Sequence, residues 1–239
     1  GRERIYLLEQ QAELIEKMGI DTMFAILLDD KLKNTGCEEF LEKYLFGYIK
    51  AKHIVCGYDY TFGVNKSGNA QTIAENSEIY GYSYDIIDKV CSKNERVSST
   101  LIRSLIKEGN IKRANEMLCE DFYFEGCVKC GYKLGRTIGY PTANIELSPS
   151  ITPIKHGVYS SVVTIGKKSY KGLTNIGRAP TAGIEKSPLS ETYIIGFNGN
   201  LYNRSIRVCL KDFIREEKKF ESMEELKNVI AENVRMLVN

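Results

Sequence analysis

Two patterns of apolar and polar positions divide the chain. In the first half, apolar residues recur every three or four positions, which is the spacing of amphipathic helices. The helices that this spacing predicts span 3–18, 37–49, 70–81, 98–107 and 111–118. Short apolar runs between them predict buried strands at 20–28, 54–56 and 83–87. Alternation of this kind indicates a parallel sheet with helices on both faces, so we predict an α/β first half.

Beyond Phe122 the pattern changes to short β-branched and aromatic runs between glycine-rich turns. The strands predicted here span 123–129, 157–165, 168–176, 191–197 and 205–213. Asn198-Gly199 is a turn dipeptide that predicts a hairpin. Many short strands and few helices are typical of a β-barrel.

A helix is predicted at the end of the chain, over 222–237. Ser222 and Glu225 have the spacing of a capping box, and an apolar stripe follows them. We therefore predict two domains without a long linker: an α/β module over 1–119 and a β-barrel with a C-terminal helix over 120–239.

Composition narrows the class of protein. The 239 residues are 27% charged and 43% hydrophobic, with 33 Lys and Arg against 31 Asp and Glu. This balance argues against nucleic acid as a partner. No apolar run approaches the roughly 20 residues of a membrane span, so no membrane role is predicted. Seven scattered cysteines indicate reduced thiols and a cytoplasmic protein. Cys127-x-x-Cys130 has a metal-like spacing but no second cysteine pair, so we assign no metal to it.

The stretch 126–144 carries the most specific chemistry. Its four glycines allow backbone N–H groups to approach an anion, and Lys133 and Arg136 add positive charge. The stretch ends in Pro141-Thr142-Ala143-Asn144, where Thr142 and Asn144 point to one face of an extended segment. Small oxygen ligands beside phosphates suit Mg²⁺. The alternative is that Thr142 and Asn144 are turn residues after proline.

Gly135-Arg136-x-x-Gly139-x-Pro141-Thr142-Ala143-Asn144 resembles the signature of riboflavin kinases. Later motifs agree with it in order: Gly157-Val158-Tyr159, Gly172 to Thr181, Glu191, Phe197 with Leu201-Tyr202, and Arg215 before Lys219-Phe220. Upstream, Gly57 to Gly63 and Val97 to Arg103 resemble the adenylyltransferase half of the bifunctional bacterial riboflavin kinase/FMN adenylyltransferases. The resemblance implies a partial Rossmann-like nucleotidylyltransferase module followed by a riboflavin-kinase β-barrel with a C-terminal helix.

The activity implied by this resemblance is transfer of the ATP γ-phosphate to the 5′-hydroxyl of riboflavin, which gives FMN. It implies ATP, Mg²⁺ and riboflavin or FMN as small-molecule ligands, and it leaves room for weak self-association. The family's second activity converts FMN to FAD. Two departures from the family pattern, Gly196 and Asn203, affect loops rather than chemical groups.

Each site residue is implied by its position in the family motif. Glu191 is the expected catalytic base, although a solvated strand glutamate is the ordinary alternative. Arg215 is expected to bind the flavin, the alternative being a surface cation. Thr142 and Asn144 are also the expected magnesium ligands. The residues expected to bind nucleotide and phosphate are Gly131, Lys133, Gly135, Arg136, Gly139, Thr142, Asn144 and Asn175.

A second set of residues matches the adenylyltransferase module. A hydroxyl-rich helix start with an arginine one turn later suits a triphosphate, although Ser98 alone reads more simply as an N-cap. The residues in this set are Gly57, Asp59, Phe62, Gly63, Ser98, Ser99, Thr100 and Arg103.

The family's opening strand and its histidine-containing loop have no match in this sequence, whose two histidines are His53 and His156. We therefore expect an N-terminally truncated adenylyltransferase module that is inactive in FAD formation. The alternatives are a natural variant that has lost adenylylation, an adenylyltransferase that lacks its start, and a flavin-binding protein without turnover.

Overall fold

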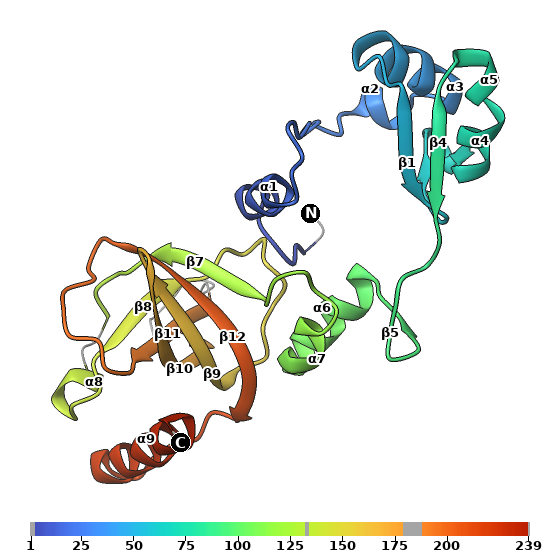
Figure 1. Cartoon of the computed structure of the whole chain (residues 1–239). Coiled ribbons are helices and arrows are strands. Elements are labelled where there is room, and N and C mark those ends of the chain that lie inside the picture. Colours follow the sequence, from blue (N-terminus) through green and yellow to red (C-terminus); the bar gives the residue numbers. More distant parts are fainter. Residues whose placement is uncertain (1–2, 132–133, 179–187, 239) are drawn as a thin grey trace. The chain divides into compact units, whose positions relative to one another are not determined.

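The computed structural model describes residues 3–131, 134–178 and 188–238 (Figure 1). The chain forms two compact units. One unit, which we call the barrel unit, contains Gly1–Gly19 and Ser98–Asn239. The other, which we call the small unit, contains Ile20–Val97. The predicted division at residue 119 therefore does not coincide with this partition of contacts, because the segments before 20 and after 97 pack with the barrel. As a boundary between functional modules, residue 119 remains a prediction.

Six antiparallel strands form the wall of the barrel (Figure 1). They are β7 (Tyr123–Cys127), β8 (Thr142–Glu146), β9 (Gly157–Ile165), β10 (Lys168–Arg178), β11 (Pro188–Ile194) and β12 (Ser205–Arg215). Their order in the sheet is β7-β12-β9-β10-β11-β8. The two edge strands meet through one bridge, in which the Lys129 amide donates to the Asn144 carbonyl oxygen at 2.9 Å. The sheet is thus a nearly closed barrel, which leaves little of its edges unpaired.

Alternation along the strands separates the inside of the barrel from its outer face. Inward positions carry side chains that are almost entirely buried, including Val163, Ile176 and Leu210. A row of hydroxyls also lies inside, where the Thr174 oxygen is 2.8 Å from that of Ser161 and 3.0 Å from that of Thr192. Because these hydroxyls pair with one another, the interior carries them without leaving polar atoms unsatisfied.

Helices of the barrel unit surround this sheet. They are α1 (Leu8–Lys17), α6 (Ser99–Glu108), α7 (Ile111–Asn115), α8 (Leu134–Thr137) and α9 (Met223–Val238). The predicted caps are confirmed at both ends of α6, where the Ser98 hydroxyl accepts from the Leu101 amide and Gly109 adopts a left-handed conformation. At the start of α9, Ser222 accepts from the amide of Glu225, as the capping box predicts.

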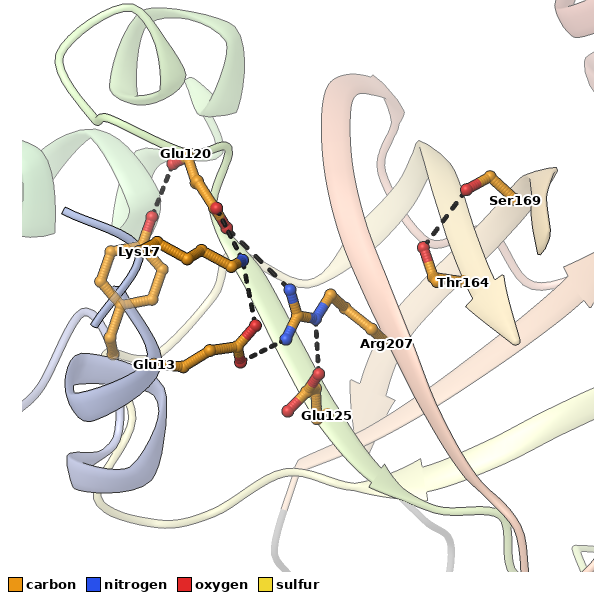
Figure 2. A network of polar contacts seen from close by, with 8 residues as sticks. Glu13, Lys17, Glu120, Glu125, Thr164, Ser169 and Arg207 are labelled. Atoms are coloured by element: carbon orange, nitrogen blue, oxygen red, sulfur yellow. Dashed lines mark hydrogen bonds and ion pairs between the residues drawn. The ribbon is translucent and has the colours of Figure 1, made fainter. Parts of the chain in front are cut away.

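An ion-pair network joins α1 to the barrel wall (Figure 2). The Arg207 guanidinium on β12 lies 2.5 Å from a carboxylate oxygen of Glu13 on α1 and 2.5 Å from one of Glu125 on β7. Glu120 lies 3.9 Å from the same guanidinium and 2.8 Å from Lys17 Nζ. These contacts explain why the first residues belong to the barrel unit.

The small unit is an α/β fold with a short parallel sheet. Its sheet pairs β1 (His53–Gly57) with β4 (Ser83–Ile87). Its helices and remaining short strands are α2 (Asp30–Lys33), α3 (Cys37–Glu39), the π-helix η1 (Phe40–Tyr48), β2 (Thr61–Phe62), η2 (Val64–Lys66), β3 (Gly68–Asn69), α4 (Ala70–Glu75), α5 (Ser77–Tyr80), β5 (Cys91–Ser92) and β6 (Glu95–Arg96). A small core gathers Leu41, Phe62, Ile73 and Tyr82.

Two predictions of local structure are wrong. Residues 20–28 form no strand and most of their large side chains are exposed, Leu27 at 84%. A strand needs a neighbour for its backbone groups, and no described strand pairs with this run. Asn198-Gly199 does not close a hairpin either, because β11 and β12 are not neighbours in the sheet. The predicted helix over 37–49 exists but is mostly a π-helix.

Candidate functional site

One row of residues crosses the barrel wall at a single level. Glu191 on β11 lies directly opposite Asn144 on β8 and opposite Asn175 on β10. The row continues through Val158 on β9 to Arg215 on β12. Residues that face each other across antiparallel strands point to the same side of the sheet. Residues far apart in the sequence are therefore brought together on the outer face of the barrel.

Four residues of this row, Val158, Asn175, Glu191 and Arg215, line a cavity of about 310 Å³, which we call the first cavity; Asn144 is not among its lining residues. Arg215 reaches it because β12 carries two register shifts against β9, between Leu210 and Asp212 and between Phe213 and Arg215. Such bulges re-aim a side chain. The lining residues are Leu134, Gly135, Ile138, Tyr140, Thr142, Val158, Leu173, Asn175, Glu191, Tyr193, Arg215, Glu217, Lys218, Phe220, Leu226 and Ile230. Most of these side chains are apolar or aromatic, as in sites for a flat organic ligand.

A second cavity, of about 250 Å³, also borders Thr142. Its lining combines the motif of β8 with the loop that precedes β12. The residues around it are Val128, Arg136, Pro141, Thr142, Ala143, Ile194, Phe197, Asn198, Gly199, Asn200, Leu201 and Tyr202. Among the described residues, Thr142 lines both the first and the second cavity.

Glu191 is the carboxylate at the centre of the row. Burial in the first cavity raises its pKa, and the nearby charge of Glu217 raises it further. Both effects disfavour the charged form and make the ionised carboxylate a stronger base. A base of this kind is suited to accept a proton from a hydroxyl group.

Asn144 has the properties of a ligand that lacks its partner. Its side chain is 6% exposed, and its Oδ1 atom is buried with no hydrogen-bond partner among the described residues. Its Nδ2 atom donates to the Thr142 carbonyl oxygen at 3.3 Å, which turns Oδ1 the other way. The described residues contain no group of three or more His, Cys, Asp or Glu side chains that could hold a metal ion. The unpaired amide oxygen is the kind of group that fits Mg²⁺, because this ion prefers oxygen ligands and takes few of them from the protein when phosphates are present.

The glycines of the motif shape the loop above Asn144. A Cβ atom on Gly131 would lie 2.7 Å from Asn144 Nδ2, so the loop approaches the amide only because this residue is glycine. Gly139 has φ +87°, which also favours glycine. Gly135 lines the first cavity and Arg136 the second. Lys133, predicted here as a phosphate ligand, lies outside the described residues.

Arg215 and Asn175 are each held by a residue that the sequence did not single out. The Arg215 Nε atom donates to Asn233 Oδ1 on α9 at 3.0 Å, and burial lowers the pKa of the guanidinium. Asn175 Nδ2 donates to Glu217 Oε1 at 3.2 Å. Asn233 was detectable as a polar residue next to the apolar stripe of α9. Glu217 had no signal, because it stands in a run of charged residues.

The residues predicted for the adenylyltransferase site fall in both units. Gly57, Asp59, Phe62 and Gly63 belong to the small unit, where Phe62 is buried in the core and Asp59 pairs with Arg96.

Ser98, Ser99, Thr100 and Arg103 belong to the barrel unit. Ser98 caps α6, Arg103 lies 3.4 Å from the Thr100 hydroxyl, and Ser99 and Arg103 line a third cavity of about 510 Å³. The two sets of residues belong to different units. That they form one adenylyltransferase site therefore stays a prediction.

Comparison with known families matches both halves of the chain. The riboflavin kinase model matches residues 118–238, and the FAD synthetase model matches residues 1–101. The bifunctional riboflavin kinase/FMN adenylyltransferase of Escherichia coli K12 is 32% identical over 95% of this chain and 72% of its own length. The protein of the same name from Buchnera aphidicola of Schizaphis graminum is 32% identical over 98% of this chain and 76% of its own.

A solved structure supports the fold over nearly the whole chain. It is named as a macrolide-efflux protein from Streptococcus pneumoniae, with a TM-score of 0.90 and 28% identity, covering 99% of this chain and 76% of that one. In the part of this chain that the structure describes, no helix is both long and apolar enough to cross a membrane. Both family matches agree with the α/β region and with the near-closed barrel and its C-terminal helix. The chain belongs to the bifunctional riboflavin kinase/FMN adenylyltransferase family.

Proposed function

We propose that the barrel unit transfers the γ-phosphate of ATP to the 5′-hydroxyl of riboflavin, giving FMN and ADP. The observation that carries this proposal is the position of Thr142, which lines both cavities, while Glu191 lines the first. Two substrates that occupy the two cavities would meet at Thr142. A transferring phosphoryl group needs such a meeting point, because positioning supplies most of the catalysis.

Riboflavin is assigned to the first cavity and ATP to the second. The apolar and aromatic walls of the first cavity suit a flat ring system, and Arg215 adds a cation. The second cavity offers Arg136 and the backbone around Pro141, which suit phosphate groups. We also assign Gly131, Gly139 and Asn144 to the phosphate side.

Glu191 is the proposed general base. Its carboxylate accepts the proton of the 5′-hydroxyl as that oxygen forms a bond to the γ-phosphorus and the bond to the β-phosphate oxygen breaks. Burial keeps water away from the carboxylate and raises its pKa. When Mg²⁺ is bound, it neutralises charge on the phosphates; Thr142 and Asn144 are the residues that would hold it.

We further propose that this 239-residue chain does not convert FMN to FAD. The sequence contains no match to the histidine loop of the family, and His53 is instead engaged on the small sheet, 2.7 Å from the Ser83 hydroxyl and 3.2 Å from Asp85. Loss of electrostatic stabilisation of a transferring phosphate strongly lowers the reaction rate.

Seven free thiols support a reducing compartment such as the cytoplasm.

Product chromatography tests both statements. The purified chain is incubated with riboflavin, ATP and Mg²⁺, and separately with FMN, ATP and Mg²⁺. We expect FMN and ADP in the first reaction and no FAD in the second. Riboflavin binding without ADP release would identify a flavin-binding protein and overturn the kinase assignment. Steady FAD formation would overturn the second statement.

A further inference from the structure

Glu217 is a second carboxylate in the first cavity, next to the proposed base. It follows β12 and lines the cavity together with Glu191 and Asn175. The charge of Glu217 disfavours the ionised form of Glu191 and adds to the rise in its pKa that burial causes. The presence of Glu217 at this place therefore calls for a role that outweighs this cost.

Contacts from two other segments hold the Glu217 carboxylate in place. Asn175 Nδ2 on β10 donates to its Oε1 atom at 3.2 Å. His156 Nδ1, just before β9, lies 3.8 Å from its Oε2 atom. Gly177 leaves room for it, because a Cβ atom there would lie 2.4 Å from Oε1 and would push the carboxylate away from Asn175.

The carboxylate decides which way the Asn175 amide faces. An ionised carboxylate can only accept hydrogen bonds, whereas an amide has a donating nitrogen and an accepting oxygen. Glu217 therefore selects the nitrogen, and the Asn175 oxygen remains available as an acceptor. Asn175 stands directly opposite Glu191 in the register of β10 and β11, so the Asn175 residue neighbours the proposed base.

We propose that Glu217 is a positioning residue that fixes the Asn175 amide, so that its oxygen accepts a hydrogen bond from a hydroxyl of the polyol chain of riboflavin. This inference rests on the proposed kinase function. The polyol chain connects the ring system to the 5′-hydroxyl, so an oriented acceptor beside Glu191 would help to place the reacting oxygen. Glu217 acts through Asn175 and does not take part in the chemistry itself.

Single and double variants test the role. Glu217→Gln keeps the size of the side chain but can donate as well as accept, so the Asn175 amide loses its fixed orientation. We expect KM for riboflavin to rise about 5- to 30-fold, the range for one oriented hydrogen bond, with KM for ATP unchanged. Asn175→Ala should have a similar effect, and the double variant should be no worse than Asn175→Ala alone.

Glu216→Gln is the matched control. Glu216 is the neighbouring carboxylate, its side chain is 76% exposed, and it pairs with Lys155 at 3.2 Å outside the first cavity. We expect its kinetics to equal those of the parent chain. A flavin with a methyl group in place of the polyol chain (lumiflavin) gives a second control, because its dissociation constant should be the same for the parent chain and Glu217→Gln.

Additive effects of Glu217→Gln and Asn175→Ala, or an unchanged KM for riboflavin, would overturn the proposal. A readout that does not depend on activity is the side-chain amide resonance of Asn175 in ¹⁵N-HSQC spectra, assigned with the Asn175→Ala variant. It should shift in Glu217→Gln and stay in place in Glu216→Gln. If the parent chain fails to phosphorylate riboflavin, the proposed function falls, while the spectra still report whether Glu217 orients Asn175.

Discussion

The barrel unit and the small unit differ in how completely the edges of their sheets are paired. The barrel wall runs through six strands, and its edges meet at the Lys129–Asn144 bridge. The small unit has a parallel sheet of two strands. Parallel strands are normally covered on both faces, yet Val55 on β1 is 59% exposed and Ile87 on β4 is 48% exposed.

This difference bears on where a precise site can be built. The row from Asn144 to Arg215 depends on the pairing of five strands, including the two register shifts of β12 against β9. In the barrel each of these strands is fixed by neighbours, so the side chains at one level keep their spacing. The small unit holds its shape with few buried side chains, so we expect it to open more readily and to contribute little to phosphoryl transfer.

Glu191→Gln should have the largest effect. It should lower the catalytic rate of the barrel unit without lowering its stability. The substitution removes the base but keeps the size of the side chain, so we expect the rate of ADP release to fall about 10²- to 10⁴-fold. Riboflavin binding and the melting temperature should change little, because no charged partner is lost. Single-turnover kinetics and flavin titration measure these quantities.

Glu146→Gln is the control for this experiment, since Glu146 lies on neighbouring β8, is exposed and pairs with Lys129. Turnover at the parent rate in Glu191→Gln would show that this carboxylate is not the base. Glu185, which lies outside the described residues, would then be the next candidate.

Leu41→Ala should break the small unit and spare the barrel. Leu41 is fully buried in the core of the small unit, and its truncation should cost about 2–5 kcal/mol of unfolding free energy there. Hydrogen exchange over 40–87 should speed up, while exchange over 157–178 and FMN formation stay the same. Leu27→Ala, at a position 84% exposed, is the matched control and should change neither. Loss of kinase activity in Leu41→Ala would contradict the independence of the two units.

Thr174→Val should act on the barrel alone and by a smaller amount. It keeps the shape of the side chain but removes the hydroxyl that links Ser161 and Thr192, so Ser161 loses its hydroxyl partner while Thr192 keeps Ser190 at 3.3 Å. We expect a loss of about 1–3 kcal/mol in a denaturant titration. Thr164→Val is the control, because its 3.5 Å contact with Ser169 lies at the surface (Figure 2). An equal loss in both variants would mean that the buried hydroxyl row has no special role.

Glu13→Gln should give the smallest effect, and that effect should depend on pH. Lys17 and then Arg207 lower the pKa of Glu13 in the folded chain. A lowered pKa gives stability that is present above the unfolded pKa and is lost as the pH falls through the folded pKa. Because the side chain is 36% exposed, we expect less than about 1 kcal/mol.

The measurement for Glu13→Gln is the unfolding free energy at neutral pH and below the folded pKa. The difference from the parent chain should appear at neutral pH and vanish in acid. Glu16→Gln, at an exposed position of the same helix, should show no such difference. A difference that persists in acid would exclude the ion pair as its cause.

Local signals in the sequence were sufficient for most elements of the barrel. The bounds predicted for β9 agree with the structure, as do the serine caps of α6 and α9, because strand patterns and caps depend on neighbouring residues. The glycine-rich stretch before Asn144 was also recognisable, since close approach of a backbone to a ligand or an amide requires glycine. The resemblance carried by these residues led to the family that the comparisons show.

Features that depend on pairing between segments far apart in the sequence were decided only by the tertiary structure. It left 20–28 without a partner among the described strands, although the apolar pattern of this run matches a buried strand. A strand forms only where another strand supplies hydrogen bonds. The tertiary structure placed Glu191 between Asn144 and Asn175 through the order of β8, β11 and β10, which the sequence does not state. It also brought Glu217 to Asn175, since a charged residue in a charged run acquires a role only from the side chain that folding places beside it.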